Sequence, residues 1–431
     1  MRLSLVLLLL AAVGLCRAAT DTCNILSAKS PTLRLKRHLF CEYDTSIRPV
    51  LSKNTAVNVS VVIRPMLMNF IDDKSTFILH AWISFEWTDQ HLTWKPEDFD
   101  GVQETRVKSD EIWVPDFALY NSGDMETSQT GIPETLCQLS HTGSVICLPS
   151  IKYKTLCESD FTYWPYDKQT CTLRMGSWTH TGEEISFDFK NSSIDMSNYR
   201  ENNEWKILNY TASKKNPKYS CCPNETFPSL LLDFELARHP TMLHAAYITP
   251  AVVLMVITLT VLWLDSRSVE RISLAAVNFI CHLLCINDLH WMVPVNGSYG
   301  SPHILLFFRD SMVLATFAMV VTTLLRKLQS TKVAPPGWIV ATVTIVASNR
   351  AGRFLLLDDN NVAGDDKQLV SNNNSGSGDV EENVSVFAAK TDANESWRKL
   401  AIIIEWLAFI ATAFTYIMLI ILLVPSPVSW K

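Results

Sequence analysis

The sequence predicts an extracellular β-sandwich followed by a bundle of four transmembrane helices. Residues 20–240 alternate between apolar and polar side chains and contain no run long enough to cross a bilayer, whereas four long apolar runs follow. The chain is 48% hydrophobic and 19% charged, although a soluble domain is usually about 25% charged. A net charge of −6 excludes the basic surface that nucleic acid requires.

Residues 1–19 are typical of a secretory signal peptide. Met1-Arg2 precedes an apolar run, Leu3–Leu15, and small residues follow at Ala18-Ala19. A signal anchor is the alternative, but the apolar run is too short to span a membrane. We therefore expect residues 20–240 to lie outside the cell, where disulfides persist.

Residues 20–240 are expected to form mainly short strands. Period-2 alternation is clearest in Val57–Val61 and Ile78–Trp87, and turn residues separate the runs at 121–124 and 141–144. This spacing favours a β-sandwich, with a short helix within 24–40. N-glycosylation sequons, a weak signal by themselves, agree with an outside location; they lie at Asn58, Asn191, Asn209, Asn224 and Asn296.

The apolar runs predict transmembrane helices at 242–264, 272–293, 304–328 and 400–424, each about 20 residues or longer. Basic residues favour the cytoplasmic side, and they flank the third and fourth runs at Arg326, Lys327, Lys332, Arg398 and Lys399. This places both termini outside and leaves an extracellular tail, 425–431. Residues 329–399 become a cytoplasmic loop, with an apolar helix near the membrane in 335–357 and a disordered stretch in 358–396.

Eight of the eleven cysteines belong to the outer domain, because Cys16 leaves with the signal peptide and Cys281 and Cys285 fall in a span. The eight are Cys23, Cys41, Cys137, Cys147, Cys157, Cys171, Cys221 and Cys222. An even number is typical of a disulfide framework, but eight cysteines allow 105 pairings. Cys137 and Cys147 flank a turn and can pair across a hairpin, which leaves Cys23 with Cys41 as a weaker expectation. A disulfide between adjacent cysteines such as Cys221 and Cys222 is rare. The alternative is that each of the two forms a disulfide with another cysteine.

Several segments resemble the pentameric Cys-loop ligand-gated ion channels, and within them the α-type subunits of nicotinic acetylcholine receptors. Cys157 and Cys171 enclose thirteen residues that include Phe161–Asp167, sequence FTYWPYD, and match the family's signature loop. Three further segments match nicotinic binding loops: Trp113–Asn121, Gly176–Thr179 and Tyr219–Cys222. The resemblance implies disulfides Cys157–Cys171 and Cys221–Cys222, and a ring of five subunits.

The resemblance also implies an agonist site between neighbouring outer domains. Its principal face is expected to carry Tyr120, Trp178, Tyr219, Cys221, Cys222 and Phe227, and its complementary face Trp82. Aromatic faces attract a cationic amine at about 0.5–2 kcal/mol per ring, so the expected ligand is acetylcholine or a similar cationic amine, with no cofactor or metal. Phe227 stands where the family usually has Tyr, and Arg174 and Ser229 replace a lysine and an aspartate that the family couples to the loop tyrosine.

The same match predicts two further functional groups. Asp72 and Arg238 are expected to form a charge pair that couples the outer domain to the first span, with a solvated surface pair as the alternative. The second span is expected to line the pore with Glu270, Ser273, Val277, Ile280, Leu284, Asn287, Asp288 and Trp291. A ring of Glu270 favours cations, and the apolar members can close the pore by dewetting. Trp291, Asn278, His282 and His290 depart from the family.

The leading hypothesis is therefore a subunit of an acetylcholine-gated cation channel in a postsynaptic plasma membrane, assembled with other nicotinic-type subunits. One alternative is a non-conducting, modulatory partner subunit, which the unusual pore residues favour. Another is a membrane-anchored binding ectodomain that is not a channel. An enzyme is not expected, because His141, His180 and Asp195 form no nucleophile motif and no metal-spaced cluster is found.

Overall fold

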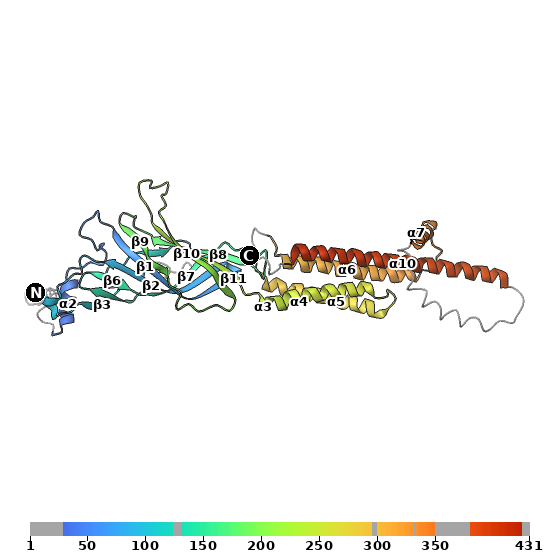
Figure 1. Ribbon diagram of the computed structural model, residues 1–431, viewed down its shortest axis with the longest axis horizontal. Helices are drawn as coiled ribbons and strands as arrows, with labels where there is room; N and C mark the ends of the chain where they lie inside the picture. Colours follow the sequence, from blue (N-terminus) through green and yellow to red (C-terminus); the bar gives the residue numbers. More distant parts are fainter. Residues whose placement is uncertain (1–28, 124–130, 295–299, 332, 350–379, 425–431) are drawn as a thin grey trace, which may run out of the picture. The chain divides into compact units, whose positions relative to one another are not determined.

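The computed structural model describes residues 29–123, 131–294, 300–331, 333–349 and 380–424, and of 191–192 and 380–394 only the backbone (Figure 1). The chain divides into two compact units. The strand unit comprises the residues up to Asp160 together with Lys168–His239, and the helical unit comprises Phe161–Asp167 and the residues from Pro240 onward. The signal peptide predicted at 1–19 lies outside the described residues.

The strand unit contains two sheets, which confirms the predicted β-sandwich. The first has the order β3-β5-β6-β2-β1-β9, with β7 also paired to β2, and the second has the order β10-β11-β8-β4. The strands are β1 Val57–Ile71, β2 Thr76–Thr88, β3 Glu104–Lys108, β4 Phe117–Leu119, β5 Leu136–Ser140, β6 Ser144–Cys147, β7 Ser150–Leu156, β8 Lys168–Ser177, β9 Ile185–Ile194, β10 Trp205–Lys215 and β11 Ser229–Arg238. A helix, α2 Pro31–Phe40, precedes them and begins on a proline, which suits the first helical turn.

Aromatic side chains join the two sheets of the sandwich. Phe117 of β4 contacts Phe85 of β2 and Phe187 of β9, with ring centroids 5.1 and 4.9 Å apart. Such pairs contribute about 0.5–1.5 kcal/mol beyond the area that they bury. Three tryptophans of this unit, Trp87, Trp94 and Trp205, are buried.

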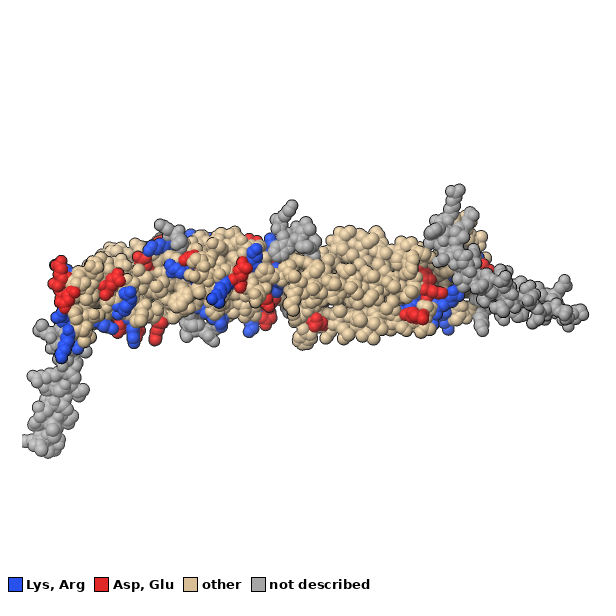
Figure 2. Space-filling view, turned by 60° about the horizontal axis from the view of Figure 1, so that its bottom comes forward, with Lys and Arg blue, Asp and Glu red and all other residues tan. Residues whose placement is uncertain are grey.

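Four helices of the helical unit are long and apolar enough to cross a membrane: Thr241–Trp263, α5 Val269–Met292, α6 His303–Gln329, and the Glu395–Leu423 part of α10 Val380–Leu423. The first combines α3 Thr241–Leu243, a π-helical turn η6 His244–Ile248 and α4 Thr249–Trp263. Pro250 lies two residues after the π-helical turn, inside this combined helix, and supplies no backbone N–H to it. On the face shown in Figure 2, charged residues lie at the ends of this unit and the middle is uncharged.

The structure of the predicted loop, 329–399, departs from the expectation at one end. The stretch 358–396 was expected to be disordered, but α10 begins at Val380, so residues 380–396 are helical. Their sequence includes good helix formers such as Ala388, Ala389 and Lys390, and they continue directly into the apolar helix. Residues 358–379 lie outside the described residues. The apolar helix expected in 335–357 is observed as α7 Gly337–Ser348.

The buried face of α5 carries Asn278 and His282, two of the three polar residues that depart from the family, whereas the third, His290, is exposed. Asn278 donates a hydrogen bond to Thr258 Oγ1 at 2.8 Å, and His282 bonds to the carbonyl of Asn278 and to Ser311 Oγ, each at 2.8 Å. Ser311 in turn bonds to Tyr416 Oη at 2.9 Å. All five side chains are buried, so this polarity connects the four helices.

A second polar group joins the helices at the N-terminal end of α5. The guanidinium of Arg271 is fully buried, ion-pairs with Glu405 of α10, and donates to Thr322 Oγ1 of α6 at 3.0 Å. It also donates to the carbonyl of Leu264, at the end of α4, at 2.5 Å. One side chain of the expected pore helix thus contacts all three other helices.

Candidate functional site

An aromatic cluster lies at one end of the second sheet. Tyr120 directly follows β4, Trp178 directly follows β8, and Tyr219 and Phe227 lie in the hairpin between β10 and β11. The ring centroids of Tyr120 and Trp178 are 6.0 Å apart, and those of Tyr219 and Phe227 are 5.5 Å apart. Because β11 begins beside the end of β8 (Ser229 pairs with Gly176) and the short β4 pairs with the same part of β8, three segments that are distant in sequence meet here.

The rings of this cluster are open to one side. Trp178 is 71% exposed and Tyr219 is 42% exposed. A large aromatic side chain this exposed on a folded domain is typical of a surface that a ligand or another chain covers. The cluster is therefore a candidate for one wall of a site.

Asp116 holds the Trp178 segment in place. Its carboxylate accepts hydrogen bonds from Ser177 Oγ at 2.6 Å and from the backbone N–H groups of Trp178 and Thr179 at 3.1 and 2.8 Å. It also accepts one from Thr179 Oγ1 at 2.6 Å. Asp116 lies inside the Trp113–Asn121 segment that resembles a binding loop, but its orienting role was not predicted from the sequence.

Gly176 is a second residue whose role only the structure reveals. A Cβ atom at this position would lie 2.4 Å from Tyr120 Oη and 2.7 Å from the carbonyl oxygen of Pro228. The absence of a side chain lets the Tyr120 ring lie across β8, where its hydroxyl donates to the carbonyl of Ser177 at 2.6 Å. Burial raises the pKa of Tyr120 to about 12, so this ring stays neutral at physiological pH.

The predicted Cys221–Cys222 disulfide is not formed in this structure. The two residues are free thiols whose Sγ atoms lie 2.8 Å apart, whereas a disulfide requires about 2.05 Å. The tight turn, in which Cys222 N–H donates to the carbonyl of Tyr219 at 3.1 Å, brings the sulfur atoms together at the hairpin tip. Closing the bridge needs a movement of less than about 1 Å.

Trp82 lies apart from this cluster. It is on β2 of the first sheet, is 45% exposed, and forms no ring contact with the four clustered aromatic residues among the residues described. One chain therefore exposes aromatic side chains at two separate places, the four-residue cluster and Trp82.

Arg174 of β8 reaches the inner side of the cluster. Its Nη2 donates to Tyr219 Oη at 2.9 Å, and its Cζ lies 5.9 Å from the centroid of the Tyr120 ring. Ser229, which stands in place of an acidic residue, is fully buried, and its hydroxyl donates to the carbonyl of Lys215 at 3.5 Å.

Asp72 and Arg238 form an ion pair with 2.8 Å between Oδ2 and Nη1, and their side chains are 27% and 6% exposed. Arg238 also lies over the ring of Trp205, with Cζ 4.2 Å from its centroid. This is a largely buried pair rather than the solvated pair that was the alternative. Arg238 is the last residue of β11, three residues before the first helix.

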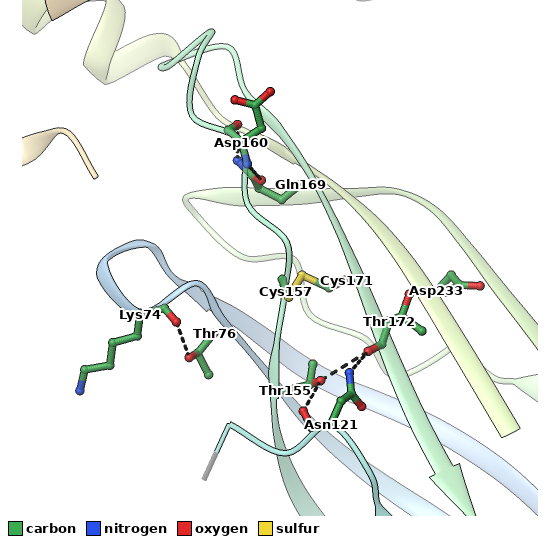
Figure 3. Close-up of a disulfide and its surroundings, with 10 residues drawn as sticks. All are labelled: Lys74, Thr76, Asn121, Thr155, Cys157, Asp160, Gln169, Cys171, Thr172 and Asp233. Atoms are coloured by element: carbon green, nitrogen blue, oxygen red, sulfur yellow. Dashed lines mark hydrogen bonds between the residues drawn. A yellow bond between two sulfur atoms is a disulfide. The ribbon is translucent and has the colours of Figure 1, made fainter. Parts of the chain in front are cut away.

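Two disulfides stabilise the strand unit. Cys137–Cys147 joins β5 to β6, and Cys157–Cys171 closes the loop between β7 and β8. Figure 3 shows Cys157–Cys171 between two hydrogen-bonded groups, the Asp160–Gln169 pair and the Asn121–Thr155–Thr172 group. Cys41 is disulfide-bonded, and its predicted partner Cys23 lies outside the described residues.

The residues inside the Cys157–Cys171 loop pack within the helical unit. The ring centroid of Trp164 lies 5.4 Å from that of Tyr247 in η6, and the carbonyl of Thr162 accepts from the N–H of His303 at 3.0 Å. Tyr166 Oη hydrogen-bonds to His244 Nδ1. The loop is thus fixed at the starts of α6 and of the first helix.

All eight residues expected to line a pore lie on the exposed part of α5: Glu270, Ser273, Val277, Ile280, Leu284, Asn287, Asp288 and Trp291. Trp291 is the most exposed of the large apolar members, at 79%. Asp288 also accepts a hydrogen bond from Tyr247 Oη at 3.1 Å, so it is held toward the first helix.

Among the predicted glycosylation sites, Asn58, Asn209 and Asn224 are exposed. The side chain of Asn191 and all of Asn296 lie outside the described residues. No group of three or more His, Cys, Asp or Glu side chains that could hold a metal ion occurs in the described part of the chain.

Comparisons with known proteins agree with this architecture. A family model described as the neurotransmitter-gated ion-channel ligand binding domain matches residues 32–240. The neuronal acetylcholine receptor subunit alpha-2 of Gallus gallus is 32% identical over 297 residues, covering 67% of this chain and 54% of the relative, and that of Homo sapiens has the same values. The human neuronal acetylcholine receptor subunit beta-3 is 29% identical over 324 residues, covering 73% of this chain and 68% of the relative. The chain spans about half the length of the alpha-2 relatives that it matches.

Proposed function

Because this chain belongs to the nicotinic family of Cys-loop receptor subunits, we propose that it is a subunit of an acetylcholine-gated cation channel. It is a multi-pass plasma membrane protein. Agonist binding at the junction of two subunits opens a pore lined by α5, in a pentamer whose termini both lie outside the cell and whose membrane is postsynaptic. The observation that carries the proposal is the aromatic cluster of Tyr120, Trp178, Tyr219 and Phe227 at the end of the second sheet.

This cluster suits a cationic amine. A quaternary or protonated amine has little hydrogen-bonding geometry for a carboxylate to exploit, but it is attracted to aromatic faces at about 0.5–2 kcal/mol per ring when desolvated. Three or four rings supply much of the roughly 8 kcal/mol of micromolar binding. Trp82 of a neighbouring subunit closes the open side, and oxidation of Cys221 and Cys222 stiffens the hairpin tip above the ligand.

The Asp72–Arg238 pair is proposed to couple this site to the pore. Removing one partner of a largely buried pair leaves the other charge uncompensated, so movement of the Asp72 loop shifts Arg238 and with it the chain that enters the first helix. Glu270 sets the charge at the inner mouth of the pore, and Val277, Ile280 and Leu284 form its apolar constriction.

Trp178→Ala should abolish acetylcholine binding in the assembled receptor, because Trp178 is the largest and most exposed ring of the cluster. Binding of radiolabelled acetylcholine to membranes from cells that express the subunit with other nicotinic subunits measures the effect. Tyr210→Ala is the matched control, since Tyr210 has the same 42% exposure as Tyr219 but lies within β10, outside the cluster. If the Trp178 variant and the control bind acetylcholine equally, Trp178 is not part of the binding pocket and the proposal is wrong.

Glu270→Gln should weaken the preference for cations, because each copy removes one negative charge from the inner mouth. The reversal potential of acetylcholine-evoked currents in a salt gradient reports the change. Glu395→Gln is the control, because Glu395 is an exposed acid of α10 that pairs with Lys399. A reversal potential unchanged in both variants argues against α5 as the pore helix.

A modulatory subunit that does not conduct alone is the second candidate, and the exposure of Trp291 favours it. In a pentamer of this chain alone, five Trp291 side chains at the outer end of the pore would narrow it. A pentamer that also contains other subunits has fewer of these side chains. Currents recorded from the chain alone and together with nicotinic partners separate the two candidates.

A further inference from the structure

The aromatic cluster has a positive charge at its inner side, and the acidic residue expected to accompany that charge is replaced by Ser229. The guanidinium of Arg174 donates to Tyr219 Oη at 2.9 Å, and its Cζ lies 5.9 Å from the Tyr120 ring centroid. The backbone of Arg174 is held from both directions, because its N–H donates to Asn121 Oδ1 at 3.0 Å and its carbonyl accepts from the N–H of Tyr120 at 2.7 Å. The charge therefore lies close to two of the four rings.

No acidic group pairs directly with this charge. Among the described residues, Arg174 forms no ion pair with a carboxylate. The Asp116 carboxylate contacts the four donors of the Trp178 segment and, at 3.4 Å, His180 Nδ1. Asp233 accepts from Thr172 Oγ1 at 2.5 Å, and Ser229 offers only a buried hydroxyl that donates to the backbone. A guanidinium also cannot lose its proton in a protein.

This charge changes which ligands the cluster favours. A ligand whose only charge is positive is attracted by the rings but repelled by Arg174, and two like charges separated by about 7 Å weaken binding on the order of tenfold. In a ligand that also carries a carboxylate, a charge-assisted hydrogen bond from Arg174 to the carboxylate offsets this repulsion. The planar guanidinium can bind both carboxylate oxygens.

We propose that the pocket binds a small zwitterionic amine, with its ammonium group against the rings of Trp178 and Tyr219 and its carboxylate on the guanidinium of Arg174. The inference rests on the proposed amine-binding function and narrows its ligand class. Acetylcholine, whose carbonyl is only a neutral acceptor, is then a weaker ligand than a carboxylate of similar size.

The test compares choline with glycine betaine, which share a trimethylammonium group and differ in bearing a hydroxymethyl group or a carboxylate. Binding of each radiolabelled compound is measured on the assembled, full-length receptor. We expect betaine to bind at least tenfold more tightly than choline, and Arg174→Gln to abolish that preference while choline binding stays equal or improves. Arg174→Lys should retain a smaller preference for betaine, since lysine keeps the positive charge but lacks the planar guanidinium that binds two carboxylate oxygens.

Glutamine at position 174 can still donate to Tyr219, so a purely structural role of Arg174 predicts an equal loss of both ligands, which would overturn the proposal. Choline binding as tightly as betaine in the unaltered receptor would also overturn it. The proposed function is judged separately by acetylcholine binding and its dependence on Trp178. Retained Trp178-dependent acetylcholine binding without a preference for betaine refutes this inference alone, whereas betaine binding that ignores Trp178→Ala refutes the aromatic pocket itself.

Discussion

Glu405→Gln is expected to destabilise the helical unit by about 3–5 kcal/mol, the usual result of breaking one side of a buried ion pair. The variant leaves the fully buried guanidinium of Arg271 without its counter-charge. Its bonds to Thr322 and to the carbonyl of Leu264 remain, but neutral acceptors cannot balance a charge in an apolar bundle. The thermal stability of the detergent-solubilised receptor, and the amount delivered to the cell surface, measure the loss.

Two further variants separate charge burial from other effects. Arg271→Met combined with Glu405→Met removes both charges and should recover most of the stability, because apolar replacements of a buried pair are often neutral or better. Glu395→Gln removes an acid from the same helix, but its ion pair with Lys399 has both side chains well exposed, so it should change stability by less than about 1 kcal/mol. A Glu405 variant as stable as the Glu395 variant would show that the pair contributes little.

Cys157→Ser combined with Cys171→Ser is expected to prevent delivery of the subunit to the cell surface. Closing a loop of about 15 residues stabilises a fold by about 3 kcal/mol in the chain-entropy model, and this bridge encloses thirteen residues. The residues that it constrains include Thr162, Trp164 and Tyr166, whose contacts fix the loop within the helical unit. Surface labelling of intact cells, compared with total protein, gives the readout.

Cys281→Ser and Cys285→Ser are the controls for this experiment, because both residues are free thiols on α5. They test whether thiol loss by itself affects delivery. Surface delivery of the Cys157/Cys171 variant at the level of the controls would contradict a structural role for the bridge.

Much of the architecture could be predicted from local patterns. Alternation in Val57–Val61 and Ile78–Trp87 marks strands because a pleated strand turns successive side chains to opposite faces. An apolar run of about 20 residues marks a spanning helix because the bilayer sets that length. The boundary at Val380 was missed, because a polar segment next to a long apolar helix can continue that helix, and composition alone does not show this.

The residues of the candidate site differ in the same way. Tyr120, Trp178 and Tyr219 were predicted because each stands in a short recognisable segment. Asp116 and Gly176 lie within such segments too, but their roles depend on atoms from other strands: Asp116 on the backbone after β8, and Gly176 on the Tyr120 hydroxyl. Cys221 and Cys222 are thiols with their sulfur atoms 2.8 Å apart in this structure, and the bridge between them stays a prediction.

By itself the sequence determined the order of the parts: a strand domain, four apolar helices, a cysteine-closed loop and the aromatic segments, all of which are properties of contiguous residues. Only the tertiary structure decided the partners of the charged and polar side chains. It paired Arg271 with Glu405, turned Asn278 and His282 inward, and placed Arg174 against the rings without a carboxylate. The physical reason is that hydrogen bonds and ion pairs act over a few ångströms between residues far apart in the chain, whereas strand alternation and helix length are set by neighbours along it.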